Sequence, residues 1–230
     1  MAYIHDALRR PPVTQNARWR FFTFFCGTLL LSFLLFGLAY LSLPHLREVM
    51  VLEDGFIENF TLFFFLEAVV LSALLLARGA AKRPNLLVGG LSLFFILEEI
   101  SYGQRLFPGL TFAELPNGAT FDALSDVNRI MTIVLDRLGV PWELVVGGVA
   151  LLVALVFGRR LWGMLKQVWK PDSVWPYLLA AALCLAGATV VDTYINPPTK
   201  FVLLEEVCEL NAALSMLFAA LSGWVVRGER

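Results

Sequence analysis

Six long apolar stretches constrain the fold of this chain more than any motif does. A helix needs about twenty apolar residues to cross roughly 30 Å of hydrocarbon, and each stretch comes near that length. Only 16% of the residues are charged and 58% are hydrophobic, whereas about a quarter of a typical soluble domain is charged. We therefore expect one all-α, polytopic membrane helix bundle over residues 1–230, with about six transmembrane helices. These helices cover residues 21–43, 58–77, 85–104, 141–158, 174–194 and 201–226.

The positive charges alternate between the two sides of these predicted spans. Connections rich in Lys and Arg stay in the cytoplasm. Thirteen of the 18 Lys and Arg residues lie before the first span, after the last span, or in the connections after the second and fourth spans. The pattern predicts that both chain ends are cytoplasmic in a multi-pass plasma membrane protein. The net charge of −1 gives no basic surface for nucleic acid, so the expected partner is the lipid bilayer.

The longest outer connection contains a further periodic segment near residues 122–138. Apolar residues recur there at helical spacing, with Asp and Arg residues between them. This pattern predicts an amphipathic helix on the outer surface of the membrane. A lid over a site beneath it is the alternative, because long ordered loops often serve that role.

Carboxylates from four predicted helices lie at one depth, near the outer ends of those helices. An ionised carboxylate in hydrocarbon costs about 2.5–3.5 kcal/mol on insertion scales, so a group of them indicates a functional site. Glu67 is separate, because it points to the other side of its helix, and we interpret it as a protonated acid bonded to a neighbouring helix. The clustered acids are Asp54, Glu58, Glu98, Glu99, Asp192, Glu205, Glu206 and Glu209.

Clustered carboxylates repel one another unless something positive neutralises them. Ligands that are all oxygen suit hard divalent cations such as Ca²⁺, Mg²⁺ or Mn²⁺. Zinc prefers imidazole, and of the two histidines only His45 is predicted to lie on the outer side. The predicted cation ligands are Glu58, Glu99, Asp192, Glu206 and Glu209, with Asp54, His45, Gln104, Glu205 and Asn211 around them.

A purely structural interpretation of the same residues stays open. Glu98 or Glu99 can pair with Arg105, and Glu206 can pair with Lys200, so that the charges only fix helix packing near the interface. In the functional interpretation, Glu98, Glu99 and Arg105 are instead the candidate catalytic residues.

The run from Glu98 to Arg105, E-E-I-S-Y-G-Q-R, resembles an E-E-I-S-W-G-Q-R segment of bacterial multi-pass membrane proteins of unknown function. The same proteins carry an E-D-G-x-x-E sequence, which the run from Glu53 to Glu58 resembles. Tyr102 stands where those proteins have Trp. The resemblance covers about the first half of the chain, and it implies a bacterial inner membrane setting without implying an activity.

Three functions are compatible with these features. The first is a cation-dependent membrane hydrolase or transferase, in which the bound ion activates water against a lipid or lipid-linked substrate. The second is a cation- or proton-coupled transporter that uses the same acids as its ion site. The third is a non-catalytic assembly protein whose acids receive a basic region of another membrane protein.

Overall fold

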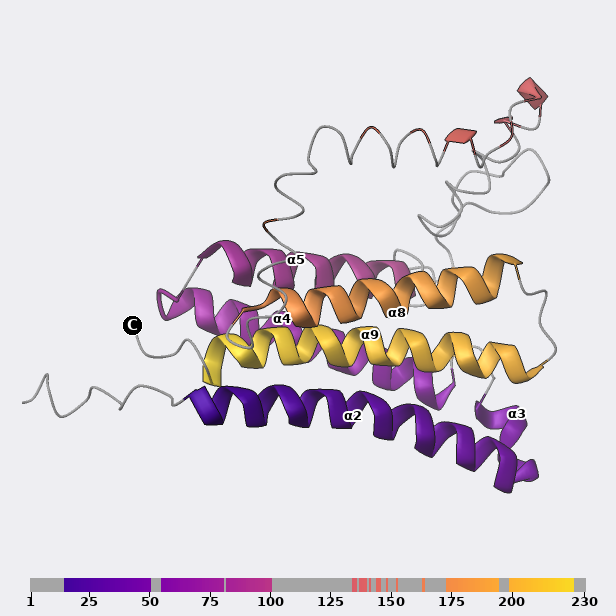
Figure 1. Cartoon of the computed structure of the whole chain (residues 1–230), viewed down its shortest axis with the longest axis horizontal. Coiled ribbons are helices and arrows are strands. Elements are labelled where there is room, and N and C mark those ends of the chain that lie inside the picture. The colour runs from indigo at the N-terminus through magenta and orange to yellow at the C-terminus, as the bar shows by residue number, and fades with distance from the viewer. Residues whose placement is uncertain are drawn as a thin grey trace, which may run out of the picture. The chain divides into compact units, whose positions relative to one another are not determined.

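The computed structural model of the chain is helical throughout the part that it describes, without a strand there (Figure 1). It describes residues 15–50, 55–80, 82–100, 173–194 and 199–225, and eleven residues between 134 and 163, namely 134, 135, 137–139, 141, 144, 145, 148, 152 and 163. Contacts divide the chain into two units. The first unit is Met1–Leu93 with Gln167–Arg230, and the second is Phe94–Lys166.

Five long helices form where the sequence predicts spans. They are α2 (Gln15–Ser42), α4 (Phe56–Ala77), α5 (Lys82–Glu99), α8 (Trp175–Tyr194) and α9 (Thr199–Val225). In the described part, α2, α4 and residues Trp175–Asp192 of α8 are long and apolar enough to cross a membrane. The chain therefore has the character of a helical membrane protein. The number of six spans and the single domain stay predictions.

Helix α9 is the centre of the first unit. It packs against α8, α4 and α2, and Figure 1 shows it between α2 and α8. Every residue from Asn211 to Ala220 is buried. This stretch contains four alanines and a serine, and such small residues let neighbouring helices approach closely in a membrane.

The side-chain contacts fix the directions of the helices that surround α9. Ile57 of α4 packs against Leu203 near the start of α9, and Arg78 at the end of α4 stacks over Trp224 near the end of α9, 4.3 Å from the ring centroid. Helix α4 therefore runs parallel to α9. Helix α2 runs antiparallel to α9, because Phe25 contacts Phe218 whereas residues later in α2, such as Tyr40, contact the start of α9.

One end of the first unit is held by aromatic rings, and we call it the aromatic end. Phe25 of α2 lies 4.8 Å from Tyr177 of α8 and 5.2 Å from Phe218 of α9, measured between ring centroids. Phe21 contacts the same two rings. Such edge and tilted ring pairs contribute about 0.5–1.5 kcal/mol beyond the area they bury. Because Tyr177 lies near the start of α8, this cluster also sets α8 antiparallel to α9.

Local sequence explains the helix ends. Helix α4 stops at Gly79, whose φ of 75° favours glycine. The Gly79 N–H donates to the Leu76 carbonyl at 3.0 Å and the Ala80 N–H donates to the Leu75 carbonyl at 2.9 Å, which is the Schellman arrangement.

The connection after α2 folds into two short helices, η1 (Pro44–Leu46) and α3 (Arg47–Met50). Arg47 reaches back to the end of α2, where its Nε donates to the Tyr40 carbonyl at 2.7 Å and its Nη2 donates to the Leu41 carbonyl at 3.3 Å. A cation here also complements the negative end of the helix dipole.

Helix α5 approaches α4 closely at Gly89. A Cβ atom at Gly89 would lie 3.0 Å from the Ser72 Cβ, so a larger residue would push the two helices apart by a few tenths of an ångström. The helix ends at Glu99, whereas the sequence predicted a span through residue 104; residues 101–133 lie outside the described part.

The predicted amphipathic helix near 122–138 and the predicted span 141–158 fall in the second unit and are described at few positions. Residues 134, 135, 137 and 138 are helical, and Gly139 follows them with a φ of 65°. Residues 144, 145, 148 and 152 are also helical. The remainder of both segments lies outside the described residues, so both stay predictions.

Candidate functional site

Three helices of the first unit meet at the end opposite the aromatic rings. Helix α4 begins there, α9 begins there, and α8 ends there, as the contacts of Ile57 and the antiparallel course of α8 require. Five of the predicted acids lie at this position. We call it the acidic end, and it comprises Glu58, Asp192, Glu205, Glu206 and Glu209.

Glu58 is the most enclosed of these acids, with 7% of its surface exposed. It lies in the first turn of α4, where a negative charge complements the positive end of the helix dipole. Its neighbour Ile57 is 1% exposed and packs against Leu203, Val207 and Leu210 of α9. The start of α4 is thereby pressed against the first three turns of α9, which carry the other glutamates.

Asp192 and Glu205 lie on α8 and α9, two helices that pack against each other. Asp192 lies near the end of α8 and is exposed, while Glu205 is half-buried in α9. The Asp192 carboxylate lies within electrostatic range of Glu205. Two like charges held together at a protein surface favour a proton or a cation between them.

Glu206 and Glu209 are both half-buried on α9. Glu209 lies ten residues after the first residue of α9, roughly 15 Å along the helix at 1.5 Å per residue. The Glu205 and Glu209 carboxylates both lie within electrostatic range of the Cys208 side chain. Glu205 and Glu209 therefore flank Cys208 on α9.

The interface between α8 and α9 is close below the acids because small residues line it. A Cβ atom placed at Gly187 would lie 3.6 Å from the Cys208 Sγ. The Cys184 thiol, one turn before Gly187, interacts electrostatically with Cys208. All three cysteines are free, in keeping with packing residues.

Asn211 lies just beyond Glu209 and is fully buried. Its Nδ2 donates to the Val207 carbonyl at 2.7 Å and to the Ser32 Oγ of α2 at 3.2 Å. Within the described part, its Oδ1 has no hydrogen-bond partner. Asn211 thus ties α9 to α2 beneath the acidic end; its predicted role around a cation stays a prediction.

The other predicted site residues are placed as follows. Glu98 and Glu99 lie in the last turn of α5 and belong to the second unit. His45 is exposed in η1. Asp54, Gln104 and Arg105 lie outside the described residues.

Metal ligands were considered among the described residues only. Among those residues, no group of three or more His, Cys, Asp or Glu side chains has an arrangement that could hold a metal ion. Asp54 and residues 101–133, which include Gln104 and Arg105, lie outside the described part. The divalent cation stays a prediction.

The structural roles of two residues, Arg47 and Gly187, were not predicted from the sequence. Arg47 was not singled out from the sequence, although a basic residue just after a helix is a known signal for capping its carbonyls. Gly187 was not singled out, although a glycine inside an apolar helix often marks a close helix contact.

A family model described as a domain of unknown function (DUF8692) matches residues 129–224. The matched range covers α8 and all of α9 except its last residue. It excludes the runs 53–58 and 98–105, so the resemblance to bacterial multi-pass proteins stays a prediction. No curated protein and no solved structure matches the chain.

Proposed function

We propose that this chain is a multi-pass membrane protein that binds a hard divalent cation at its acidic end. The observation that carries the proposal is that Asp192 near the end of α8 and Glu205 near the start of α9, two helices that pack together, lie at the same end as the buried Glu58. Folding brings these like charges together against their repulsion, and a protein keeps such an arrangement when function needs it. Oxygen ligands select Ca²⁺, Mg²⁺ or Mn²⁺.

The specific use that we propose for this cation is hydrolysis or group transfer on a lipid or lipid-linked substrate. A bound divalent ion can activate water and polarise an ester or phosphoester. In this proposal Glu98, Glu99 and Arg105 keep the catalytic role that the sequence predicts. The setting is a bacterial inner membrane with six spans, both chain ends in the cytoplasm and the acidic end outside, as the Lys and Arg pattern supports.

The packing of the first unit argues against the transporter alternative. A carrier needs a path past α9, and residues 211–220 of that helix are all buried. At the aromatic end, the rings of Phe21, Phe25 and Tyr177 pack with Phe218 of this stretch. Among the described residues, the close packing of this stretch favours the other two functions.

A second candidate function is favoured by the exposure of Asp192. An exposed acid beside a half-buried one suits a Lys or Arg from another membrane protein as well as it suits a metal ion. In that case the chain is a non-catalytic partner, and the acids determine which protein it binds.

The two candidates differ in their response to a metal alone. We would titrate Mn²⁺ into the detergent-purified full chain and measure bound ion by electron paramagnetic resonance. The variants are Glu205→Gln and, as a matched control, Glu67→Gln, which makes the same side-chain replacement about 13 Å along α4 from Glu58 at the helical rise. The cation proposal expects one bound ion per chain, weakened at least tenfold by E205Q and unchanged by E67Q. If Mn²⁺ does not bind to the wild-type chain, the cation proposal is wrong, and the non-catalytic partner is the function that stays.

A further inference from the structure

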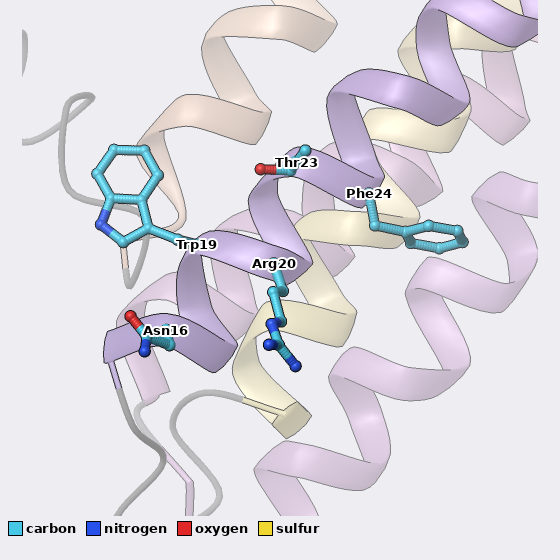
Figure 2. Close-up of a pocket in the computed structure, with 5 residues that line it drawn as sticks. All are labelled: Asn16, Trp19, Arg20, Thr23 and Phe24. Carbon is cyan, nitrogen blue, oxygen red and sulfur yellow. The ribbon is translucent and has the colours of Figure 1, made fainter.

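A second surface of α2 has the chemistry of a binding site and lies far from the acids. Five residues at positions i, i+3, i+4, i+7 and i+8 of the helix line one side of a shallow, open hollow of about 520 Å³. They are Asn16, Trp19, Arg20, Thr23 and Phe24. Figure 2 shows the Arg20 side chain between Trp19 and Phe24.

The side chains of this hollow combine hydrogen-bond donors with aromatic surface. The Arg20 guanidinium is a fixed positive charge with five donors, and Asn16 and Thr23 add an amide and a hydroxyl. Trp19 is 46% exposed and Phe24 is 66% exposed, so both offer ring surface to a ligand. A ligand that fits has a negatively charged, oxygen-rich group next to an apolar part.

The apolar surface continues along α2 in one direction only. Leu30, Leu31 and Leu34 are between 51% and 61% exposed, and Gly27 between Phe24 and these leucines has open space where a Cβ would be. From residue 16 to residue 34 this surface therefore changes from polar and cationic to wholly apolar. The same order, from anionic headgroup to acyl chain, is found along a phospholipid.

The position of the hollow agrees with the headgroup level of a bilayer. It lies at the aromatic end, where Phe25, which points into the bundle, is only 2% exposed. Arg78 and Trp224 lie at the same end, and Trp and Arg are the residues that gather at membrane interfaces.

We propose that this surface of α2 binds an anionic glycerophospholipid. The lipid phosphate accepts hydrogen bonds from Arg20, Asn16 and Thr23, the Trp19 ring packs against the glycerol region, and an acyl chain follows Phe24 toward Leu31. Charge complementarity and the polar-to-apolar order select this occupant over a second copy of the chain. The inference does not depend on the acidic end, which lies at the opposite end of the unit.

Native mass spectrometry of the delipidated full chain in detergent tests the proposal. The probe is dioleoyl phosphatidylglycerol, with dioleoyl phosphatidylcholine as the zwitterionic comparison. Arg20→Gln is the test variant. Arg83→Gln is its matched control, because Arg83 is exposed in the first turn of α5 and its loss changes the net charge equally.

We expect the wild-type chain to retain phosphatidylglycerol in preference to phosphatidylcholine, and R20Q to weaken that binding about fivefold, the effect of about 1 kcal/mol for one cation near a membrane surface. R83Q should leave binding within twofold, and inorganic phosphate should not displace the lipid. Equal losses in R20Q and R83Q would overturn the site, since they indicate general charge attraction. Displacement by phosphate, or a dimer that excludes lipid, would also overturn it.

Discussion

The acidic end and the aromatic end of the first unit are built from the same helices but are held by opposite kinds of interaction. At the aromatic end, Phe21 and Phe25 of α2 pack 4.8–6.0 Å from Tyr177 of α8 and Phe218 of α9, and such ring pairs stabilise the fold. At the acidic end, carboxylates gather instead, and Asp192 lies within electrostatic range of Glu205. The residues that stabilise the unit and the residues of the candidate site therefore lie at different ends of one bundle. Removing a ring at the aromatic end should lower the unfolding free energy, whereas removing a carboxylate at the acidic end should raise it.

The largest effect is expected from Phe25→Ala at the aromatic end. Phe25 is 2% exposed and contacts Tyr177 and Phe218, so its removal leaves a cavity and costs about 3 kcal/mol of unfolding free energy. Thermal unfolding of the detergent-solubilised chain measures this loss. The control is Phe63→Ala, because Phe63 is 50% exposed and should change stability little. Equal losses in both variants would show that the ring cluster has no special role.

At the acidic end the same measurement should move the other way for Glu205→Gln. In buffer with EDTA, the substitution relieves repulsion from Asp192 and raises the unfolding free energy by up to about 1 kcal/mol. Glu67→Gln serves again as the comparison and should not reproduce the gain. A clear loss of stability in E205Q would instead mean that the Glu205 carboxylate is part of a stabilising ion pair.

The substitution Gly79→Ala tests the backbone conformation that ends α4, at the aromatic end. Its φ of 75° is strained for any residue with a Cβ, so Gly79→Ala should cost about 1 kcal/mol. Gly90 is inside α5 with open space around a Cβ, so Gly90→Ala should be neutral or slightly stabilising. Unfolding midpoints that shift in the same direction for both glycines would contradict the assigned helix end.

The smallest effect is expected at Arg47, next to the acidic end. Arg47→Ala removes two hydrogen bonds to the last carbonyls of α2 and should lower stability by about 0.5–1 kcal/mol. Arg47→Lys keeps the charge but loses the fork of donors, and should recover only part of the loss. Hydrogen exchange of the last turn of α2 reports the change locally. Unchanged exchange in R47A would remove the capping role.

The helices themselves could be predicted closely from sequence, because the thickness of a bilayer sets the length of an apolar run. Helix α4 was predicted as residues 58–77 and is Phe56–Ala77, and α9 was predicted as 201–226 and is Thr199–Val225. Helix α2 begins at Gln15, six residues before the predicted start, because the polar residues of its first turns still favour a helix although they are too polar for the span itself.

The candidate site was less predictable, because helix rotation depends on neighbours that a single sequence does not show. The sequence predicted Glu206 as a cation ligand and Glu205 as a residue around the cation, yet Glu205 is the glutamate within electrostatic range of Asp192. The bond from Asn211 to Ser32 joins residues 179 positions apart, and no local pattern indicates it. Arg47 carried a local signal, but its function depends on the turn formed by η1, which follows from Pro44.

A double-mutant cycle between Asp192→Asn and Glu205→Gln tests whether the two carboxylates of the acidic end interact. The unfolding free energies are measured without divalent cations. If the two carboxylates repel each other, either single substitution relieves the same repulsion, and the double variant gains less than the sum of the two by about 0.5 kcal/mol or more. Gains that add within about 0.3 kcal/mol would show that the two acids do not interact, and the acidic end would then offer no reason to bind a cation.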